Sequence, residues 1–442
     1  MQIKKHLNFD ALVQDFIDIV DKVPEHRRAA SSIYSIRDIM LSALSCMYLQ
    51  SSSLLNFQSK TSDKACRQNL KSVFKVSSIP SANAIKEFID IVRPEDIAPL
   101  FKRYINKLQQ SNILREYKFL NDKYLVALDG SQYFSSKKIS CKSCLVKEHR
   151  KGVKTYSHQV LQASIVSPNK KYILPFMPED IVNQDGSDKQ DCEINASKRM
   201  LPKINKAHPR LNKVWLADSL YANSKFISLI RKTNQNDNFI FRAKEGDHKI
   251  LYEHIDNAQA QKYNEEVKKG REILYYNWYN DVPLNASSDI RVNALRVYAK
   301  EIDRHGNKES TIVGTWITDI IIDKDNVSEI TKAARSRWMI ENECFNTLKN
   351  HGYSIDHSYG HGEKNLSFNF YTLTLLAFTM HQMQHLTEKI FQSLFVLKKT
   401  KKMFWFSILS AFQILVFESW SHMMITLFKL SDPNSDYTMH PT

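Results

Sequence analysis

The sequence is poor in the features that mark a secreted or disulfide-stabilised protein. Only six of its 442 residues are cysteines. Its first ten residues, MQIKKHLNFD, contain no apolar core of a secretory signal. We therefore expect a cytoplasmic protein whose cysteines are free thiols or metal ligands and not a disulfide framework.

The sequence also lacks an uninterrupted apolar run long enough for a membrane helix. Its most apolar segment, 403–428, is interrupted by Gln413, Glu418 and His422. These polar residues favour a buried helix over a membrane span. Internal repeats and low-complexity linkers are not apparent either. The chain length predicts two to four folded domains with ample core. Because the apolar segment is interrupted, we expect no membrane-spanning part.

Acidic residues are outnumbered by basic ones. The chain has 62 Lys and Arg against 47 Asp and Glu, which gives a formal net charge of +15 at pH 7. A surplus of this size favours a polyanionic partner, with DNA or RNA as the main class and an anionic membrane surface as the alternative.

Residues 1–118 have the apolar spacing of α-helices. The clearest helical segments are 9–20, 36–49 and a helix that Ser81 is expected to cap. Basic residues cluster in the same region, at 26–28, 64–75 and 101–107. The pattern predicts a helical N-terminal DNA-binding region, although a solvated helical face has the same pattern.

Residues 119–244 are expected to form an α/β unit with a mixed sheet. Two aspartates, Asp129 and Asp218, each stand at the end of an apolar run, where ligands gather in open α/β sheets. The predicted order is three strands of an antiparallel meander, then helix, strand, helix and strand. These elements are expected at 123–129, 158–168, 171–181, 189–204, 213–218, 223–232 and 239–244.

The rest of the chain divides into three parts. Residues 245–320 alternate apolar and polar side chains and predict a β-rich insertion of hairpins. Residues 321–390 are expected to complete the core, and 391–442 to form a helical C-terminal region. Trp278, in the insertion, is a candidate for stacking on a displaced DNA base, although core packing is the commoner role of such a residue.

One carboxylate stands out in the second part of the core. On a helix over 335–349, Glu341 lies among apolar residues, where it loses hydration unless a cation compensates. Arg337 precedes it by four residues, so an intrahelical ion pair is one explanation and a metal site is another. The residues that share this helical face are Trp338, Glu341, Phe345 and Leu348.

Asp129, Asp218 and Glu341 together suggest a metal-binding acidic triad. Three clustered carboxylates repel one another, and a divalent cation offsets that repulsion. Oxygen-only ligands select Mg²⁺ or Mn²⁺, and two such ions can catalyse phosphodiester chemistry on nucleic acid. Taken singly, Asp129 before Gly130 also fits a turn, and Asp218 also fits a helix cap.

The segments around these three acids resemble DDE-type insertion-sequence transposases of the IS-four type. The resemblance covers about residues 80–390 and is carried by ALDGSQYFSS (127–136), VWLADSLYAN (214–223) and RWMIENECFNTLKN (337–350), with the loop 352–362 also matching. It implies an RNase H-like mixed sheet core that carries a β-strand insertion. It also implies Mg²⁺-dependent cleavage and strand transfer at terminal inverted repeats by the three acids. The expected partner is double-stranded DNA, both transposon ends and target, bound by a homodimer in a prokaryotic nucleoid.

The chain departs from the family signature Tyr-x2-Arg-x3-Glu-x6-Lys at two positions. Ala334 stands in place of the tyrosine, and Lys349 comes one residue late. Arg337 keeps its spacing to the glutamate, which favours Glu341 over an alternative register that uses Glu343. We expect Arg337 and Lys349 to contact DNA phosphates.

A second constellation begins at Cys141-x2-Cys144. With His149 it resembles half of a zinc site, and free thiols are the alternative. His158 follows further on, and His361 is expected to be a polar loop group near the active site, because imidazole is a poor ligand for Mg²⁺. The surrounding basic residues predict contacts to the DNA backbone with or without zinc. Those singled out are Lys147, Arg150, Lys151 and Lys154.

Two other functions are compatible with the same sequence. One is a metal-dependent DNA nuclease without strand transfer, which would use the same triad. The other is a domesticated DNA-binding protein that has lost catalysis, against which the intact Asp129, Asp218 and Glu341 argue.

Overall fold

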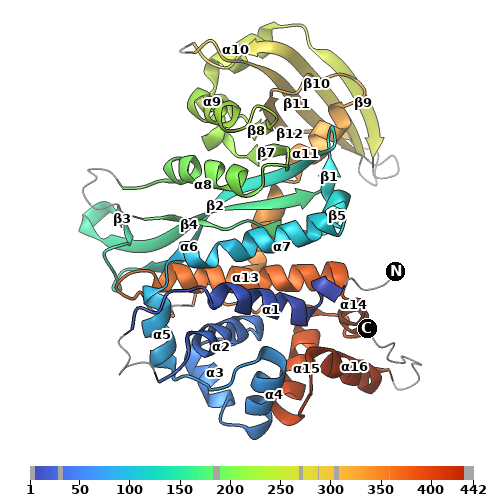
Figure 1. Cartoon of the computed structure of the whole chain (residues 1–442). Helices are drawn as coiled ribbons and strands as arrows, with labels where there is room; N and C mark the ends of the chain where they lie inside the picture. The colour runs from blue at the N-terminus through green and yellow to red at the C-terminus, as the bar shows by residue number, and fades with distance from the viewer. Residues whose placement is uncertain are drawn as a thin grey trace.

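A computed structural model of the chain describes residues 5–27, 33–182, 190–267, 272–286, 288–302, 308–357 and 359–432. Figure 1 shows a helical layer that contains both ends of the chain, and a large twisted sheet beyond it. The helix α13 (Leu366–Thr387) runs between the two and is buried over most of its length. The prediction of an α/β fold with a mixed sheet is confirmed.

The N-terminal region is helical, as its apolar spacing predicts. Polar side chains cap several of its helices: Asn8 accepts a hydrogen bond from the amide of Ala11, and Ser81 accepts one from the amide of Ala84, as expected. The helices of this region are α1 (Phe9–Val20), α2 (Ile36–Tyr48), α3 (Leu54–Lys60), α4 (Lys64–Phe74), α5 (Ala82–Ile91), α6 (Pro94–Ile97) and α7 (Pro99–Gln110).

The C-terminal helices pack against these N-terminal helices and complete the same layer. Phe9 stacks on Trp420 with 4.4 Å between ring centroids. The side-chain amide of Asn69 donates to the carbonyl of Phe412 at 2.8 Å. These helices are α14 (Lys389–Leu397), α15 (Lys401–Ile414) and α16 (Trp420–Ser431). The apolar segment 403–428 is therefore two helices, and within the described residues no helix is long and apolar enough to cross a membrane.

The predicted meander and the two strands after it form the centre of the sheet. β2 (Lys123–Ser136), β4 (Lys154–Ser167) and β5 (Lys170–Pro175) pair antiparallel. β7 (Lys213–Ala217) pairs parallel with β2, and β8 (Asn238–Arg242) pairs parallel with β7. The central order is therefore β5-β4-β2-β7-β8. The two helices that alternate with the last strands are α8 (Glu193–Ala207) and α9 (Ser224–Thr233).

The β-rich insertion extends this sheet instead of forming a separate one. Its last strand pairs antiparallel with β8, and the other three follow in reverse chain order. Trp278 is only 4% exposed, so it belongs to the core and the base-stacking prediction is wrong. The elements of the insertion are α10 (Lys249–Asn257), β9 (Gln261–Val267), β10 (Glu272–Pro283), β11 (Arg291–Ile302) and β12 (Lys308–Thr318). The remaining short strands are β1 (Lys118–Phe119), β3 (Leu145–Glu148) and β6 (Glu179–Ile181).

The segment predicted as one helix over 335–349 is not a continuous α-helix. α11 (Val327–Arg335) ends first, a π-helix covers Ile340–Asn346, and α12 covers Thr347–Asn350. The break and the wider π turn change the angular spacing of the side chains. The prediction of one apolar face is therefore wrong for Trp338, whose exposed fraction is 48%, although Leu348 is buried.

Candidate functional site

The parallel pairing of β2 and β7 brings Asp129 and Asp218 to the same level of the sheet. Ala127 pairs with Leu216 in this ladder, and each aspartate follows two residues later. Neighbouring strands lie about 4.8 Å apart, so the two carboxylates extend from adjacent backbone positions. The sequence predicted that Asp129 ends its strand. Instead, β2 continues past Asp129, beyond the end of its parallel neighbour β7.

Asp218 uses one oxygen to cap the short helix that follows β7. Its Oδ1 accepts a hydrogen bond from the amide of Leu220 at 2.9 Å, at the start of a 3₁₀ turn over Ser219–Tyr221. The cap proposed from sequence as an alternative role is therefore present. It fixes the carboxylate beside Asp129 and is compatible with a second role there.

Glu341 reaches this pair of strands through Arg337. One guanidinium nitrogen of Arg337 lies 3.1 Å from Asp129 Oδ2, and the other lies 2.5 Å from Glu341 Oε1. The Arg–Glu pair expected from sequence therefore exists, although Arg337 lies in the turn between α11 and the π-helix, and the same arginine also contacts Asp129 of β2. Arg337 holds the position between the two carboxylates that a cation would favour.

A fourth carboxylate, Glu193, stands beside the same group. A Cβ added at Gly130 would lie 2.3 Å from Glu193 Cδ, so a side chain at position 130 would have to displace the end of the Glu193 side chain. The Tyr221 hydroxyl donates to Glu193 Oε2 at 3.3 Å. Sequence reasoning assigned Glu193 no role, and the glycine after Asp129 was the one signal that another group approaches the strand.

These carboxylates interact electrostatically as one group. Burial raises the pKa of Asp129 to about 7; Arg337 opposes this shift, and the charges of Glu341, Glu193 and Asp218 add to it. Burial also raises the pKa of Glu193, and the charge of Asp218 adds to that shift. All-oxygen donor sets are the kind that Mg²⁺ and Mn²⁺ prefer, but these carboxylates are not among the described side chains whose ligand atoms already lie close enough together to hold an ion.

Glu343 lies in a different environment from Glu341. Burial raises the pKa of Tyr172, and the charge of Glu343 adds to that shift. Burial lowers the pKa of Lys401, and the charge of Glu343 opposes that shift. Glu341 instead contacts the arginine that pairs with Asp129. The geometry therefore favours Glu341 as the acidic partner. Lys349 is partly exposed on α12.

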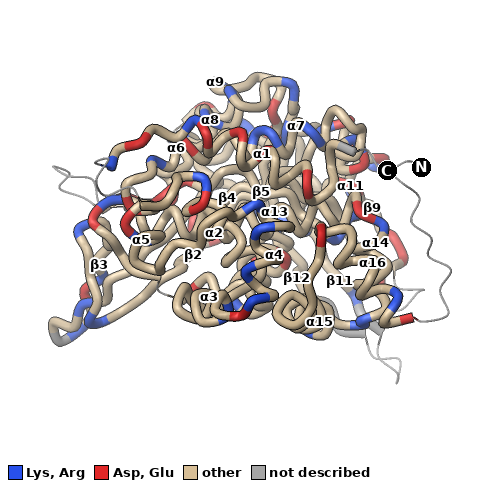
Figure 2. The backbone as a smooth tube through the Cα atoms, turned by 60° about the horizontal axis from the view of Figure 1, so that its bottom comes forward, with Lys and Arg blue, Asp and Glu red and all other residues tan. Residues whose placement is uncertain are grey.

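Basic residues expected to contact DNA form an exposed group around β3. Lys147 and Arg150 are exposed, whereas Lys154 is ion-paired with Glu148 at 2.9 Å. The side chain of Lys151 lies outside the described part of the structure. Figure 2 shows Lys and Arg concentrated around β3, at one end of the molecule.

The N-terminal basic clusters differ in how free their charges are. On and just after α4, the basic side chains share one face and are exposed. On α7, Arg103 pairs with Asp15 and Asp18, at 3.3 and 3.1 Å, and Lys107 also pairs with Asp15. The α4 group therefore offers free positive charge, to which the exposed Lys102 of α7 adds. Its members are Lys64, Arg67, Lys71 and Lys75.

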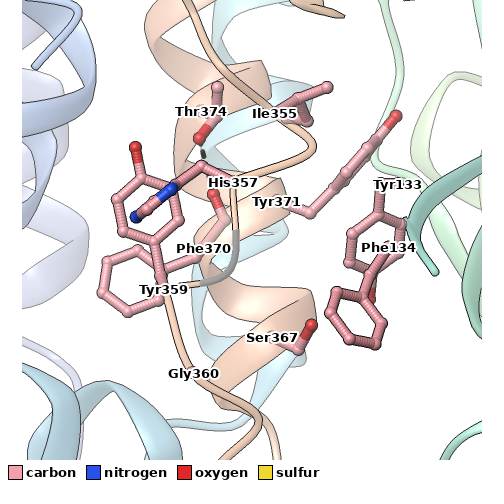
Figure 3. A pocket seen from close by; sticks show the side chains of 10 residues that line it. All are labelled: Tyr133, Phe134, Ile355, His357, Tyr359, Gly360, Ser367, Phe370, Tyr371 and Thr374. Atoms are coloured by element: carbon pink, nitrogen blue, oxygen red, sulfur yellow. Dashed lines mark hydrogen bonds between the residues drawn. The ribbon is translucent and has the colours of Figure 1, made fainter. Parts of the chain in front are cut away.

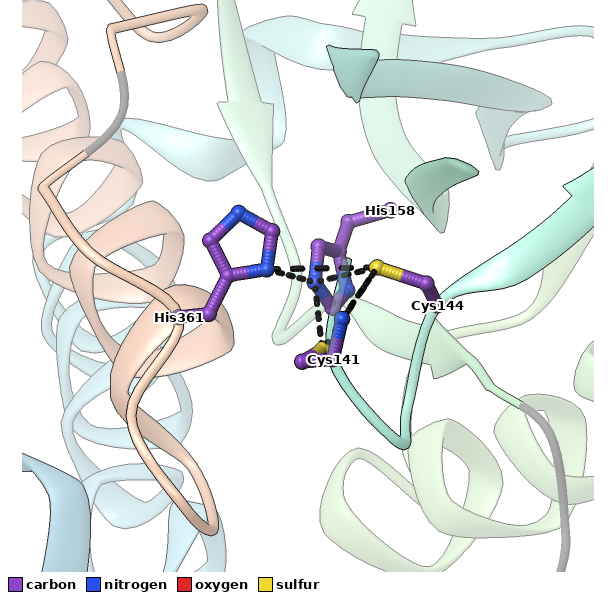
Figure 4. Close-up of side chains that lie close together, drawn as sticks. All are labelled: Cys141, Cys144, His158 and His361. Atoms are coloured by element: carbon purple, nitrogen blue, oxygen red, sulfur yellow. Dashed lines mark hydrogen bonds between the residues drawn. The ribbon is translucent and has the colours of Figure 1, made fainter. Parts of the chain in front are cut away.

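The thiol pair belongs to a second cluster. Cys141, Cys144, His158 and His361 point at one another (Figure 4), and their ligand atoms all lie within 4.8 Å of one another. His149 is not a member, because its Nε2 lies 2.9 Å from Thr155 Oγ1 on the exposed turn after β3. The prediction of His149 is thus wrong, and His361, expected to be a loop polar group, is the member that sequence reasoning missed.

Burial lowers the pKa of His158 to about 4, with the neighbouring His361 adding to the shift. His158 is therefore neutral at pH 7 and carries a lone pair.

No protein-family model matches the chain, and no curated protein matches it either.

Proposed function

We propose that this protein is a DDE-type transposase that cleaves double-stranded DNA at the ends of a mobile element and joins the freed 3′ end to target DNA. One observation carries the proposal: Asp129 and Asp218 stand level on adjacent parallel strands, and Arg337 ties Glu341 to the same place. The order β5-β4-β2-β7-β8, with a meander followed by parallel strands, supports an RNase H-like core. The sequence resemblance to IS-four-type transposases points the same way.

Each acidic residue has a defined part in this proposal. Asp129, Asp218 and Glu341 would hold Mg²⁺ or Mn²⁺, with Glu193 as a further oxygen donor beside them. When bound, such ions act as Lewis acids and lower the pKa of the attacking water or hydroxyl. Without such ions, Arg337 neutralises part of the negative charge of Asp129 and Glu341.

The displaced Lys349 fits the proposal once the π-helix is considered. In the family signature the lysine follows the glutamate by seven residues, and in this chain it follows Glu341 by eight. A π turn closes i→i+5 hydrogen bonds and holds about one residue more than an α turn. On this count the π-helix at Ile340–Asn346 would offset the extra residue and bring Lys349 toward the face of Glu341. From that face its ammonium group can pair with a DNA phosphate.

The partner in this proposal is DNA, and the functional unit is a homodimer. The net charge of +15 and the exposed basic groups on β3 and α4 suit a phosphate backbone. Two element ends must be cut within one complex, which requires two active sites.

The test uses the purified full chain and DNA carrying the short inverted repeats that flank the gene. We expect Mg²⁺-dependent cleavage at the repeat ends, and joining of a precut end with a free 3′-hydroxyl to target DNA. Cleavage without joining would replace the proposal with the nuclease. Binding without any Mg²⁺-dependent cleavage would replace it with a non-catalytic DNA-binding protein.

A further inference from the structure

The four ligand atoms of the thiol–imidazole cluster outline a tetrahedron. The two sulfur atoms of Cys141 and Cys144 lie 3.5 Å apart. His158 Nε2 lies 3.3 Å from one sulfur and 3.5 Å from the other. His361 Nδ1 lies 3.2 Å from His158 Nε2 and 3.9 Å from Cys144 Sγ.

Five of the six separations lie close to the edges expected around one Zn²⁺ ion. The sixth, between His361 Nδ1 and Cys141 Sγ, is at most 4.8 Å. Bonds of about 2.3 Å to sulfur and about 2.0–2.1 Å to nitrogen give tetrahedral edges of roughly 3.3–3.8 Å. A disulfide requires sulfur atoms about 2.05 Å apart, so the observed 3.5 Å belongs to two separate thiols. Two sulfur and two nitrogen donors in this geometry suit zinc and not Mg²⁺.

The backbone around the thiols supports metal binding. The Cys144 amide donates to the Cys141 carbonyl at 3.2 Å and closes a tight turn. The Cys141 amide donates to Cys144 Sγ at 3.3 Å, and an N–H donor of this kind stabilises a thiolate. A cavity lined by Ser140, Lys142 and Lys364, among others, borders the cluster and offers an entry path for an ion.

The imidazoles are delivered by two different parts of the fold. His158 lies on β4, opposite Phe134 of β2. His361 lies between Gly360 and Gly362, whose φ angles of 115° and 67° permit the sharp path of the loop.

The loop that carries His361 is fixed on both sides of the histidine. The Asp90 carboxylate, at the end of α5, accepts hydrogen bonds from the backbone amides of residues 363–366. Earlier in the loop, Tyr359 stacks on Phe370 of α13 with 4.8 Å between ring centroids. Figure 3 shows this part of the loop, with Tyr359 and Gly360, running alongside α13. His361 is therefore presented to the thiols by a preformed loop.

We propose that Cys141, Cys144, His158 and His361 bind one structural Zn²⁺ ion. The ion ties the turn after β2 to the loop between α12 and α13, and so fixes the two chain segments that continue from Asp129 and Glu341. Phe134, which lies opposite His158, follows Asp129 by five positions, about 16 Å along a strand. The zinc site is therefore distinct from the acidic group, and the proposal does not depend on the proposed function.

The test measures metal content in the full chain after expression in zinc-supplemented medium. We expect about one zinc per chain in the wild type, and loss of nearly all of it in Cys144→Ser and in His361→Ala. His149→Ala and Cys192→Ser are the matched controls. His149 lies in the same segment between β2 and β4 but outside the cluster, and Cys192 is exposed. Both controls are expected to keep the metal. Zinc retained by Cys144→Ser and His361→Ala would overturn the proposal.

A second measurement needs no variant and covers the case in which one fails to fold. The wild-type chain loaded with Co²⁺ alone is expected to show the thiolate-to-cobalt charge transfer and intense visible bands of a tetrahedral site. A thiol reagent is then expected to release zinc from the zinc-loaded chain as about two protected thiols react. A wild-type chain that takes up neither metal, or that is isolated with iron–sulfur absorbance, would also overturn the proposal. Removal of the zinc is expected to increase proteolysis in the loop 352–365.

Discussion

The acidic group and the thiol–imidazole cluster differ in how closely their side chains converge. Both draw residues from distant parts of the chain to one place. The thiol and imidazole atoms already lie within 4.8 Å of one another, and no other such group is found among the described residues. The carboxylates are spread around Arg337 and remain partly exposed. Under the two proposals, one site is preformed for a permanent ion, whereas the other stays open, as substrate chemistry at a metal requires.

A buried carboxylate elsewhere sharpens the comparison. Burial raises the pKa of Glu388 to about 7, the same value as for Asp129. The charge of Asp10 adds to the shift in the pKa of Glu388, but the carboxylate is otherwise held by hydrogen-bond donors. It accepts hydrogen bonds from the Phe9 amide, the Gln384 side chain and the Trp420 indole, and so links the N-terminal and C-terminal helices. A raised pKa alone therefore does not distinguish the acidic group; its distinguishing feature is that several carboxylates raise the pKa of one of their number.

The largest expected effect is a loss of DNA cleavage that distinguishes the two glutamates of the π-helix, Glu341 and Glu343. Glu341→Gln removes a proposed metal ligand, and we expect Mg²⁺-dependent DNA cleavage to fall by about 10³-fold. Glu343→Gln is the matched control two residues away and is expected to stay within a few-fold of the wild type. The measurement is a single-turnover cleavage assay on end DNA. Equal losses in both variants would show that the helix, and not the Glu341 carboxylate, is what matters.

The second prediction concerns the pH dependence of stability. The folded-state pKa of Glu388 is raised to about 7, so its contribution is fully present below about pH 4.5 and is lost as the pH rises through about 7, by at most about 3 kcal/mol. Asp129 adds a loss of the same sign in the metal-free protein, and excess Mg²⁺ is expected to cancel that part. Chemical unfolding between pH 5 and pH 8 measures both.

Glu388→Gln is expected to remove the part of the slope that persists in Mg²⁺. Glu418→Gln, at an exposed position in the same helical layer, is expected to leave it unchanged. A slope in Mg²⁺ that survives in Glu388→Gln would assign the titration to another group.

A smaller effect is expected at the basic group on β3. Lys147→Ala with Arg150→Ala removes two exposed charges, so we expect about tenfold weaker DNA binding and a log–log salt slope reduced by about 2. The double variant Lys402→Ala, Lys429→Ala is the charge-matched control on the C-terminal helices, at the other end of the molecule from β3. Identical salt slopes in both double variants would remove β3 from the DNA interface.

The sequence was most informative where the pattern is local. Central strands are buried on both faces, so 124–128 and 214–217 appear as unbroken apolar runs and the order of the core elements was predictable. The register that sets Asp129 level with Asp218 depends on pairing across the sheet, and no local pattern encodes it. The π-helix was also missed, because an α-helical period was assumed for the segment around Glu341.

The cluster around the thiols shows the same limit. Cys141 and Cys144 were recognised from their spacing, and His149 was chosen as their partner because it is near in sequence. The true partners of Cys144 are 14 and 217 residues away. His158 was within reach of sequence reasoning, because antiparallel pairing of β2 and β4 returns the chain to the thiols. His361 required the packing of the loop between α12 and α13, which only the tertiary structure provides.

The smallest expected effect tests whether Arg337 stands where a metal ion would. In the metal-free protein its guanidinium separates Asp129 from Glu341, so Arg337→Ala leaves the carboxylates to repel one another and is expected to cost about 1 kcal/mol, discounted for partial exposure. With Mg²⁺ the cation offsets that repulsion, and the difference between variant and wild type is expected to shrink. Arg93→Ala, which breaks the exposed pair with Asp96, is the control and should respond equally with and without Mg²⁺. An Arg337→Ala loss that is the same in chelator and in Mg²⁺ would mean that the arginine only anchors its helix to β2, and that the open character of the acidic site has another cause.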